Sequence, residues 1–300
     1  MLQQPDLPSG VNRTRVEFVG ADGNRLAGDL FQPASKGNGV VLLLHGGGQT
    51  KHAWRFTSSR LAANGWAAIA LDQRGHGDSA WVADGDYSFE AYGRDLVELC
   101  RQIEERFGGA PVVIGASLGG IASLLVADAS AGNPPYRALV LVDITPTTRE
   151  GGTDHILAFM EADLADGFGS LEEAAEAISR YLPHRPKPRS LEGLRRNLRL
   201  HPDGRYRWHW DPLFIRSRRQ PGGRPYHIED KLSNGARSLS IPIMLVRGRE
   251  SELVGEDEVK EFLRLAPHAK VRDVHGARHM VAGDVNDVFT DTVLDFLNAI

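Results

Sequence analysis

The chain has 300 residues, of which 41% are hydrophobic, and a formal net charge of −4. This charge excludes the overall basic field typical of nucleic-acid-binding proteins, so no nucleic-acid partner is expected. The single cysteine, Cys100, cannot form an intrachain disulfide, and segment 1–13 lacks the features of a signal peptide. No apolar run approaches the ~20 residues that span a bilayer. We therefore predict a soluble, cytoplasmic protein with no membrane partner.

The first two predicted strands form a hairpin. Segments 13–19 and 25–33 flank an Asp-Gly pair, which is typical of a tight turn between antiparallel strands. Short, continuous apolar runs follow at 40–44, 66–71, 111–114, 138–142, 242–246 and 270–274. Because these runs do not alternate with polar residues, they indicate strands that are covered on both faces of a mostly parallel sheet.

Helices are predicted between most of these strands. Segment 88–107 begins at Ser88, a favourable N-cap residue, and segment 284–300 places its apolar side chains along one helical face. Regular alternation of strands and helices is the pattern of an α/β fold. We therefore predict a doubly wound, mostly parallel α/β domain.

The alternation stops at residues 145–238, where no buried strand is predicted. Segment 170–182 begins with a Ser-x-x-Glu capping box and predicts a helix, and segment 190–200 predicts a second helix. A Pro-rich connector at 183–188 separates the two. An excursion of this length within a compact domain indicates a functional lid. The predicted organisation is a core of residues 1–144 and 239–300 and a cap of residues 145–238.

A serine between two glycines follows the run at 111–114, in the sequence Gly-Ala-Ser-Leu-Gly. In this pattern the turn from strand to helix is so sharp that glycine is required two positions before and after the serine. The turn exposes the hydroxyl at the N-terminus of the next helix, where amide groups favour an anion. Ser117 is therefore the candidate nucleophile. The alternative is a small residue in an ordinary strand-to-helix turn.

A nucleophilic serine needs a base, and the base needs an acid to orient it. His275 and His279 both follow the last predicted strand, and His279 lies farther into the loop, so we predict it as the base. Gly276 disfavours the helix on which this pair would bind a metal ion, so no metal site is predicted. Three carboxylates are candidates for the acid, namely Glu250, Glu252 and Asp143.

Three glycines follow the strand at 40–44, in the sequence His-Gly-Gly-Gly (45–48). Glycine lets the backbone turn its amides towards a ligand, as an oxyanion hole requires. The phosphate-binding pattern Gly-x-x-x-x-Gly-Lys and the dinucleotide pattern Gly-x-Gly-x-x-Gly are both absent. No cofactor is predicted.

With these residues in place, the chain resembles the α/β-hydrolase family over essentially its full length. The matching segments, in family order, are HGGGQT, LDQRGHGDS, GASLGG, IPIMLVRG and GARHMV. The resemblance implies an eight-stranded sheet, a Ser–acid–His triad and a cap after the sixth strand. It implies Glu252 as the acid, and it assigns the oxyanion hole to the amides of Gly47 and Leu118, with Gly48 as the second choice. It also implies structural roles for Asp72, Arg74 and His76.

The cap is expected to decide the substrate. Tyr206, Trp208 and Trp210 alternate along one extended segment, so one face of it presents three aromatic rings to the pocket or to the core of the cap. His209 on the opposite side is predicted to lie at the surface. Segment 180–224 contains twelve arginines and one lysine. These cations attract an anionic substrate or pair with acidic groups elsewhere in the chain.

The residues and the resemblance together predict a serine hydrolase that cleaves carboxylic esters or lactones through an acyl-enzyme. Its expected partner is therefore a small-molecule ester or lactone. A serine at the nucleophile position argues against the members of the family that use a carboxylate nucleophile. Two alternatives keep the same triad, a carbon–carbon bond hydrolase and a cofactor-free perhydrolase. A third is a ligand-binding protein of the same fold without activity. The sequence leaves the oligomeric state open.

Overall fold

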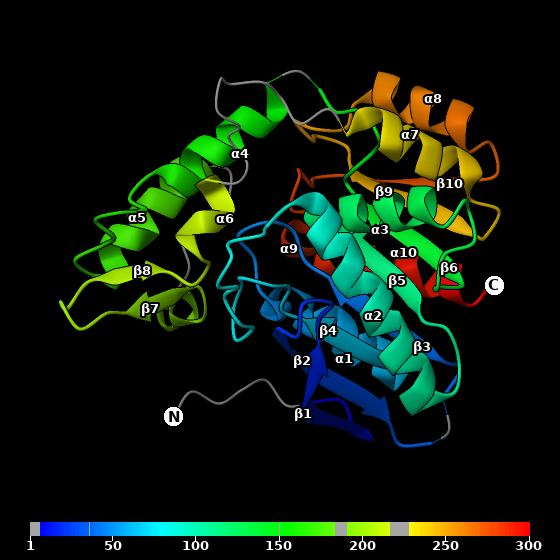
Figure 1. The fold of residues 1–300 in the computed structure, drawn as a ribbon, viewed down its shortest axis with the longest axis horizontal. Coiled ribbons are helices and arrows are strands. Elements are labelled where there is room, and N and C mark those ends of the chain that lie inside the picture. Colours follow the sequence, from blue (N-terminus) through cyan, green and yellow to red (C-terminus); the bar gives the residue numbers. More distant parts are fainter. Residues whose placement is uncertain (1–6, 36, 150, 184–190, 217–227) are drawn as a thin grey trace.

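One eight-stranded sheet, in the order β1-β2-β4-β3-β5-β6-β9-β10, forms the centre of the molecule in a computed structural model (Figure 1). The structure describes residues 7–35, 37–149, 151–183, 191–216 and 228–300. The strands are β1 (Val11–Val19), β2 (Arg25–Pro33), β3 (Val40–Leu44), β4 (Ala67–Leu71), β5 (Val112–Ala116), β6 (Ala138–Val142), β9 (Ile243–Gly248) and β10 (Lys270–Val274). β2 runs antiparallel to β1 and β4, and the neighbours from β4 to β10 are parallel. The predicted fold class is thereby confirmed.

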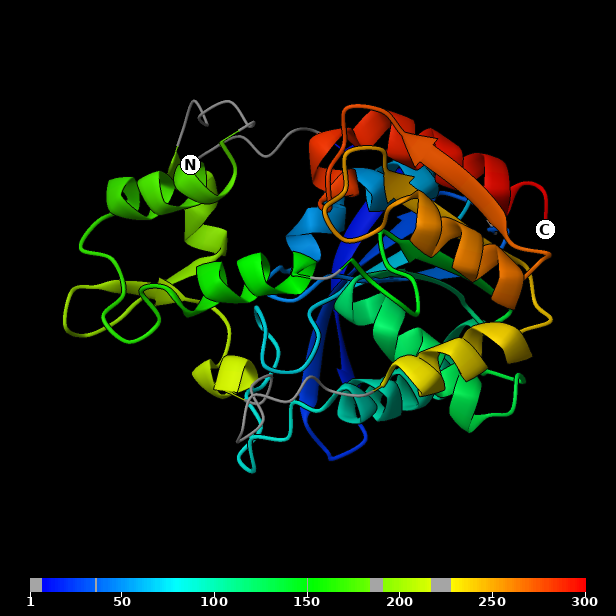
Figure 2. The same cartoon turned by 90° about the horizontal axis from the view of Figure 1, so that it is seen from above.

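Helices cover both faces of the sheet, as the continuous apolar runs predict (Figure 2). In β3, Leu42 and Leu44 pack towards one face, while Val41 and Leu43 pack towards the other. The first face is covered by α2 (Phe89–Phe107), α3 (Leu118–Ala129), α7 (Glu229–Ser238) and α8 (Glu256–Leu265). The second is covered by α1 (Arg55–Ala63), α9 (Val281–Asp284) and α10 (Asn286–Leu297). A strand between two helical layers has no polar face, which explains the sequence pattern.

Local signals fix the ends of several elements. The Ser88 hydroxyl accepts the Ala91 amide at 3.2 Å and caps α2, which ends at Gly108 in the left-handed region with φ of 80°. The Ser170 hydroxyl likewise accepts the Glu173 amide at 3.2 Å. The Glu173 carboxylate accepts the amide of Gly169 at 2.5 Å. The helix predicted at 170–182 is observed as α5 (Leu171–Tyr181).

Strand register gathers the carboxyl ends of the parallel strands at one edge. Ala116 at the end of β5 pairs with Val142 at the end of β6, and Val142 pairs with Val246 in β9. The residues that directly follow these strands therefore lie side by side. Ligand and active sites of open α/β sheets form at this edge.

The cap lies between β6 and β9 in the chain and stands beside that edge (Figures 1 and 2). It contains α4 (Gly152–Glu161), α5, the 3-10 helix η2 (Leu191–Arg196), β7 (Leu198–Leu200), β8 (Tyr206–Trp208) and α6 (Pro212–Arg216). The helix predicted at 190–200 is wrong in its second half, because β7 pairs antiparallel with β8 there. Extended pairing over a short segment has overridden helix propensity.

The range 145–238 also contains α7, which packs on α3 of the core rather than on the cap helices (Figure 1). A β-carbon on Gly235 would lie 2.1 Å from the Leu124 carbonyl oxygen, so the two helices approach closely. The Pro-rich connector at 183–188 lies outside the described residues apart from Pro183. The η1 segment (Lys51–Trp54) precedes α1 and completes the helical elements of the core.

Candidate active site

The turn at Ser117 has the strained geometry that the sequence predicts. Ser117 joins β5 to α3 with φ of 42° and ψ of −103°, a conformation that is rare for a residue with a side chain. A β-carbon on Gly115 would lie 2.6 Å from the Gly119 backbone, and one on Gly119 would lie 2.5 Å from the β-carbon of Leu44. Both glycines are therefore required by close backbone packing. Ser117 is held at the N-terminus of α3.

His279 is paired with the carboxylate of Asp143. Its Nδ1 lies 2.8 Å from Asp143 Oδ2, and the Asp143 side chain is fully buried while that of His279 is 14% exposed. Asp143 directly follows β6, beside Ser117 on the neighbouring strand. His275, the alternative base, is exposed. The structure thus brings His279 and Asp143 together at the edge where Ser117 lies.

Two further groups hold the Asp143 carboxylate. The Gly248 amide donates to Oδ1 at 2.9 Å, and the Ser251 hydroxyl donates to Oδ2 at 2.5 Å. The same hydroxyl accepts the amides of Leu253 and Val254 at 3.0 and 3.1 Å. A buried carboxylate with this many donors is fixed in its orientation. Sequence analysis assigned no role to Ser251.

Glu252 does not make the contact that the family resemblance implies. Among the described residues it has no hydrogen bond to His279, and its buried Oε2 has no hydrogen-bond partner. Its neighbour Ser251 donates to Asp143 instead, so the loop after β9 contacts the carboxylate that pairs with His279. Glu250 is exposed. Of the three candidate carboxylates, the structure places only Asp143 on His279.

The His-Gly-Gly-Gly loop leaves one of its glycine amides unused. The Gly46 amide donates to Gln49 Oε1 at 3.0 Å, and the Gly48 amide donates to His76 Nε2 at 3.1 Å. The Gly46 carbonyl accepts both the Gln49 amide at 3.1 Å and His45 Nδ1 at 2.8 Å, which fixes the peptide that carries the Gly47 amide. The Gly48 amide, the second choice for the oxyanion hole, is therefore already engaged.

The remaining amides are those of Gly47 and Leu118. Neither has a hydrogen-bond partner among the described residues. A β-carbon on Gly46 would lie 3.5 Å from the β-carbon of Ser117, so this loop runs beside the serine. Free amides beside a nucleophile are the donors that an oxyanion requires.

The turn after β4 serves as scaffold for this loop. Burial lowers the pKa of His45, whose Nε2 accepts the Gln73 amide at 3.0 Å. Asp72 accepts from the buried Lys51 ammonium at 2.5 Å. Arg74 donates twice to the Asp95 carboxylate, both times at 2.6 Å. These contacts join the turn to β3, η1 and α2.

The cap contacts the His-Gly-Gly-Gly loop directly. A β-carbon on Gly47 would lie 3.2 Å from Phe214 Cζ, and one on Gly48 would lie 2.7 Å from Met160 Cε and 3.4 Å from Trp210 Cζ3. Phe214, Met160 and Trp210 therefore form an apolar roof over the loop. Sequence analysis missed the first two, because their cap helices carry no local sign of which face meets the core.

The three alternating aromatic residues divide between two environments. Trp208 and Trp210 are buried and stack with ring centroids 4.8 Å apart, and only Trp210 reaches the Gly48 loop. Tyr206 is half-buried, and the Arg195 guanidinium lies 5.9 Å from its ring centroid. His209, which was expected at the surface, is only 2% exposed. That expectation is wrong because β8 ends at Trp208, so the alternation no longer decides the direction of the next side chain.

Several cap arginines are engaged within the protein. Arg195 and Arg207 form ion pairs with Glu192 and Asp203, and Arg199 donates to the Gly77 carbonyl. The six basic residues Arg185, Lys187, Arg189, Arg218, Arg219 and Arg224 lie outside the described residues. Ion pairing within the cap therefore accounts for part of the basic segment.

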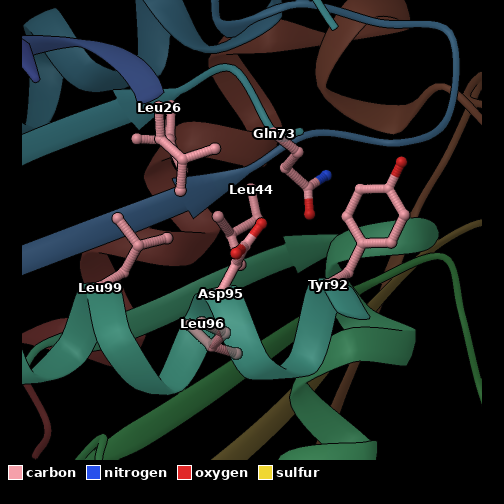
Figure 3. Close-up of a pocket in the computed structure, with 8 residues that line it drawn as sticks. Leu26, Leu44, Gln73, Tyr92, Asp95, Leu96 and Leu99 are labelled. Carbon is pink, nitrogen blue, oxygen red and sulfur yellow. The ribbon is translucent and has the colours of Figure 1, made fainter. Parts of the chain in front are cut away.

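A small hollow lies between α2 and the sheet (Figure 3). Its polar side chains make structural bonds: Gln73 donates to the His45 carbonyl at 2.6 Å, Tyr92 donates to the Arg74 carbonyl at 3.2 Å, and Asp95 pairs with Arg74. The rest of the lining is leucine. This hollow belongs to the scaffold behind the site, and Ser117 does not line it.

Within the described ranges, no three His, Cys, Asp or Glu side chains are grouped so that they could hold a metal ion. In the same part of the chain, no helix is both long and apolar enough to cross a membrane.

Known proteins share this architecture. Residues 41–292 match the profile described as the alpha/beta hydrolase family. The chain is 31% identical to esterase Rv0045c of Mycobacterium tuberculosis over 254 residues, which cover 81% of this chain and 78% of that protein. It is 28% identical to the 2-(acetamidomethylene)succinate hydrolase of Mesorhizobium japonicum over 269 residues, covering 88% and 90% of the two chains. A solved structure of the M. tuberculosis esterase matches with a TM-score of 0.72 at 26% identity, covering 96% of this chain and 92% of that one.

Proposed function

The chain belongs to the alpha/beta hydrolase family, and on that premise we propose that it cleaves carboxylic esters or lactones through an acyl-enzyme formed on Ser117. The observation that carries the proposal is the 2.8 Å contact between His279 Nδ1 and Asp143, at the sheet edge where Ser117 is held in a strained turn. Along the chain, the nucleophile, the acid and the base then follow in the family order Ser, Asp, His, with the acid directly after β6.

The proposed reaction begins with a proton transfer. Because Asp143 accepts the proton on Nδ1, the Nε2 of His279 is the basic nitrogen, and it takes the proton of the Ser117 hydroxyl. The serine oxygen attacks the substrate carbonyl carbon, and the amides of Gly47 and Leu118 donate to the resulting oxyanion. The imidazolium protonates the departing alkoxide. The same imidazole then deprotonates a water molecule, which attacks the acyl carbon. The bond to the Ser117 oxygen breaks, the imidazolium returns the proton to that oxygen, and the acid is released.

Esters and lactones are favoured because an alkoxide leaves more readily than an amine anion. The relatives support this class: they include the esterase of M. tuberculosis and a monoacylglycerol lipase of Mycolicibacterium smegmatis, which is 30% identical over 184 residues. Phe214, Met160 and Trp210 pack against the oxyanion loop and make its cap side apolar. An apolar roof suits an uncharged acyl group, and we propose Trp210 as its aromatic contact.

A substrate panel tests the proposal. Purified enzyme is assayed with p-nitrophenyl esters of graded acyl length, with lactones and with vinylogous diketones, beside Ser117→Ala as the control. We expect turnover of the esters or lactones that falls at least about 1,000-fold in Ser117→Ala. Turnover of the diketones alone would favour a carbon–carbon bond hydrolase. Binding of these compounds without any turnover would favour a ligand-binding protein.

A further inference from the structure

The buried histidine of the cap, His209, contacts two loops of the core. Its Nδ1 lies 2.8 Å from the Gly77 amide nitrogen, and its Nε2 lies 3.3 Å from the Gly48 carbonyl oxygen. An amide can only donate, so Nδ1 carries no proton and Nε2–H donates to Gly48. Burial lowers the pKa of His209 to about 3, which keeps this neutral form at physiological pH. The side chain is thus a donor directed at the oxyanion loop.

Gly48 is held from both sides. Its amide donates to His76 Nε2 at 3.1 Å, and His76 Nδ1 in turn donates to the Arg74 carbonyl at 2.9 Å. The core therefore fixes one peptide of Gly48, and the cap fixes the next through His209. Gly48 has φ of 73°, a conformation that glycine adopts readily because it has no β-carbon. Two hydrogen bonds at this residue restrict the loop that carries the free Gly47 amide.

We infer that His209 is a positioning residue of the oxyanion hole: it holds the Gly48–Gln49 peptide, whose amide donates to the Gly46 carbonyl and so helps to fix the direction of the Gly47 amide. This inference rests on the proposed function. Its consequence is that a seated cap orders the oxyanion hole as well as covering the substrate. A displaced cap would leave the Gly48 carbonyl without its donor, and oxyanion stabilisation depends on donors that are already in place.

Other contacts anchor the cap without touching the oxyanion loop. The Asp211 amide donates to the Gly75 carbonyl at 2.9 Å, and the Tyr87 hydroxyl donates to the Asp211 carboxylate at 2.7 Å. Tyr87→Phe removes the hydrogen bond to Asp211, which anchors the cap, and keeps the contact between His209 and Gly48. It is the matched control for loss of cap attachment.

Substitution of His209 by residues with amide side chains separates the acceptor and donor functions of the imidazole. Asn places its amide near the position of Nδ1, so His209→Asn keeps an acceptor for Gly77 and loses the donor to Gly48. Gln reaches the position of Nε2, so His209→Gln keeps the donor. We expect kcat for a good ester to fall about 10- to 100-fold in His209→Asn, with KM within about twofold, because the lost contact acts in the transition state. His209→Gln and Tyr87→Phe should stay within about threefold of wild type.

A second readout follows the oxyanion itself. A trifluoromethyl ketone forms a tetrahedral adduct on serine whose oxygen occupies the oxyanion hole, so its affinity should fall in His209→Asn in parallel with kcat/KM. An unchanged kcat in folded His209→Asn, or an equal loss in Tyr87→Phe, would overturn the inference. If His209→Asn does not fold, His209→Gln decides, and a tenfold loss of inhibitor affinity there contradicts it. A wild-type enzyme without activity would instead refute the proposed function together with the inference. With an active wild type, the variants test the role of His209 by itself.

Discussion

The two halves of the site are supported by different parts of the chain. The side chains of the proposed acid and base take their hydrogen bonds from core residues, since Asp143 bonds to Gly248, Ser251 and His279. The oxyanion loop is held by the core through His76 and Gln49, and also by the cap through His209. Loss of Asp143, a core residue, should disable the base, whereas loss of the His209 contact in the cap should weaken stabilisation of the transition state.

The largest effect is expected at the acid. Asp143→Asn should lower kcat by about 10,000-fold, because a neutral amide no longer holds the His279 tautomer or stabilises the imidazolium. Glu252→Gln is the control and should stay near wild type, since Glu252 has no hydrogen bond to His279. Steady-state kinetics of the two variants measures the contrast. A severe loss of kcat in Glu252→Gln beside a mild loss in Asp143→Asn would instead identify Glu252, in the loop after β9, as the acid.

A smaller effect is expected where the core supports the acid. Ser251→Ala removes the donor to Asp143 and leaves the Leu253 and Val254 amides without their acceptor. We expect kcat to fall about tenfold and the free energy of unfolding to fall by about 1–3 kcal/mol.

Ser58→Ala is the matched control for that variant. Ser58 is buried, and its hydroxyl has no hydrogen-bond partner among the described residues. The substitution should therefore leave kcat unchanged. A kcat that does not fall in Ser251→Ala, or that falls equally in Ser58→Ala, would show that Ser251 only packs the loop.

The smallest effect concerns stability and belongs to the cap. Burial lowers the pKa of His209 to about 3, whereas in the unfolded chain it is about 6.5. Between these values the unfolded chain binds the extra proton, so this contribution to stability is complete above about pH 6.5 and is lost as the pH falls towards 3. His209→Asn should therefore flatten the pH dependence of the free energy of unfolding by about 1 kcal/mol per pH unit. Urea unfolding from pH 4 to 7 measures the slope.

The exposed His275 gives the control for this measurement. His275→Asn makes the same substitution at an exposed position and should leave the slope unchanged. Parallel curves for wild type and His209→Asn would mean that His209 is protonated in the folded protein.

Much of the core could be predicted because its signals are local. Strands 40–44 and 138–142 have the predicted bounds, since a segment covered on both faces must be apolar throughout, and strand 25–33 has the bounds that the hairpin predicts. The turn at Ser117 was predictable because glycine is sterically required at Gly115 and Gly119. The order of Ser117 and His279 along the chain follows the same sheet topology.

The acid could not be fixed from the sequence, because Asp143 and Glu252 both follow strands that end at the same edge. Which of them meets His279 depends on the path of the loop after β9, where Ser251 donates to Asp143. One signal was present: Asp143 directly follows β6, as Ser117 directly follows β5. The cap was harder still, since the burial of His209 depends on contacts with Gly48 and Gly77, distant in sequence.

The central claim is that Ser117 is the nucleophile of a triad completed by His279 and Asp143. It is tested most directly by mass spectrometry of the enzyme after reaction with a fluorophosphonate probe. The account predicts one adduct, on the peptide that contains Ser117, which is absent in Ser117→Ala and forms orders of magnitude more slowly in Asp143→Asn. An adduct on another residue, or undiminished labelling of Ser117→Ala, would contradict it.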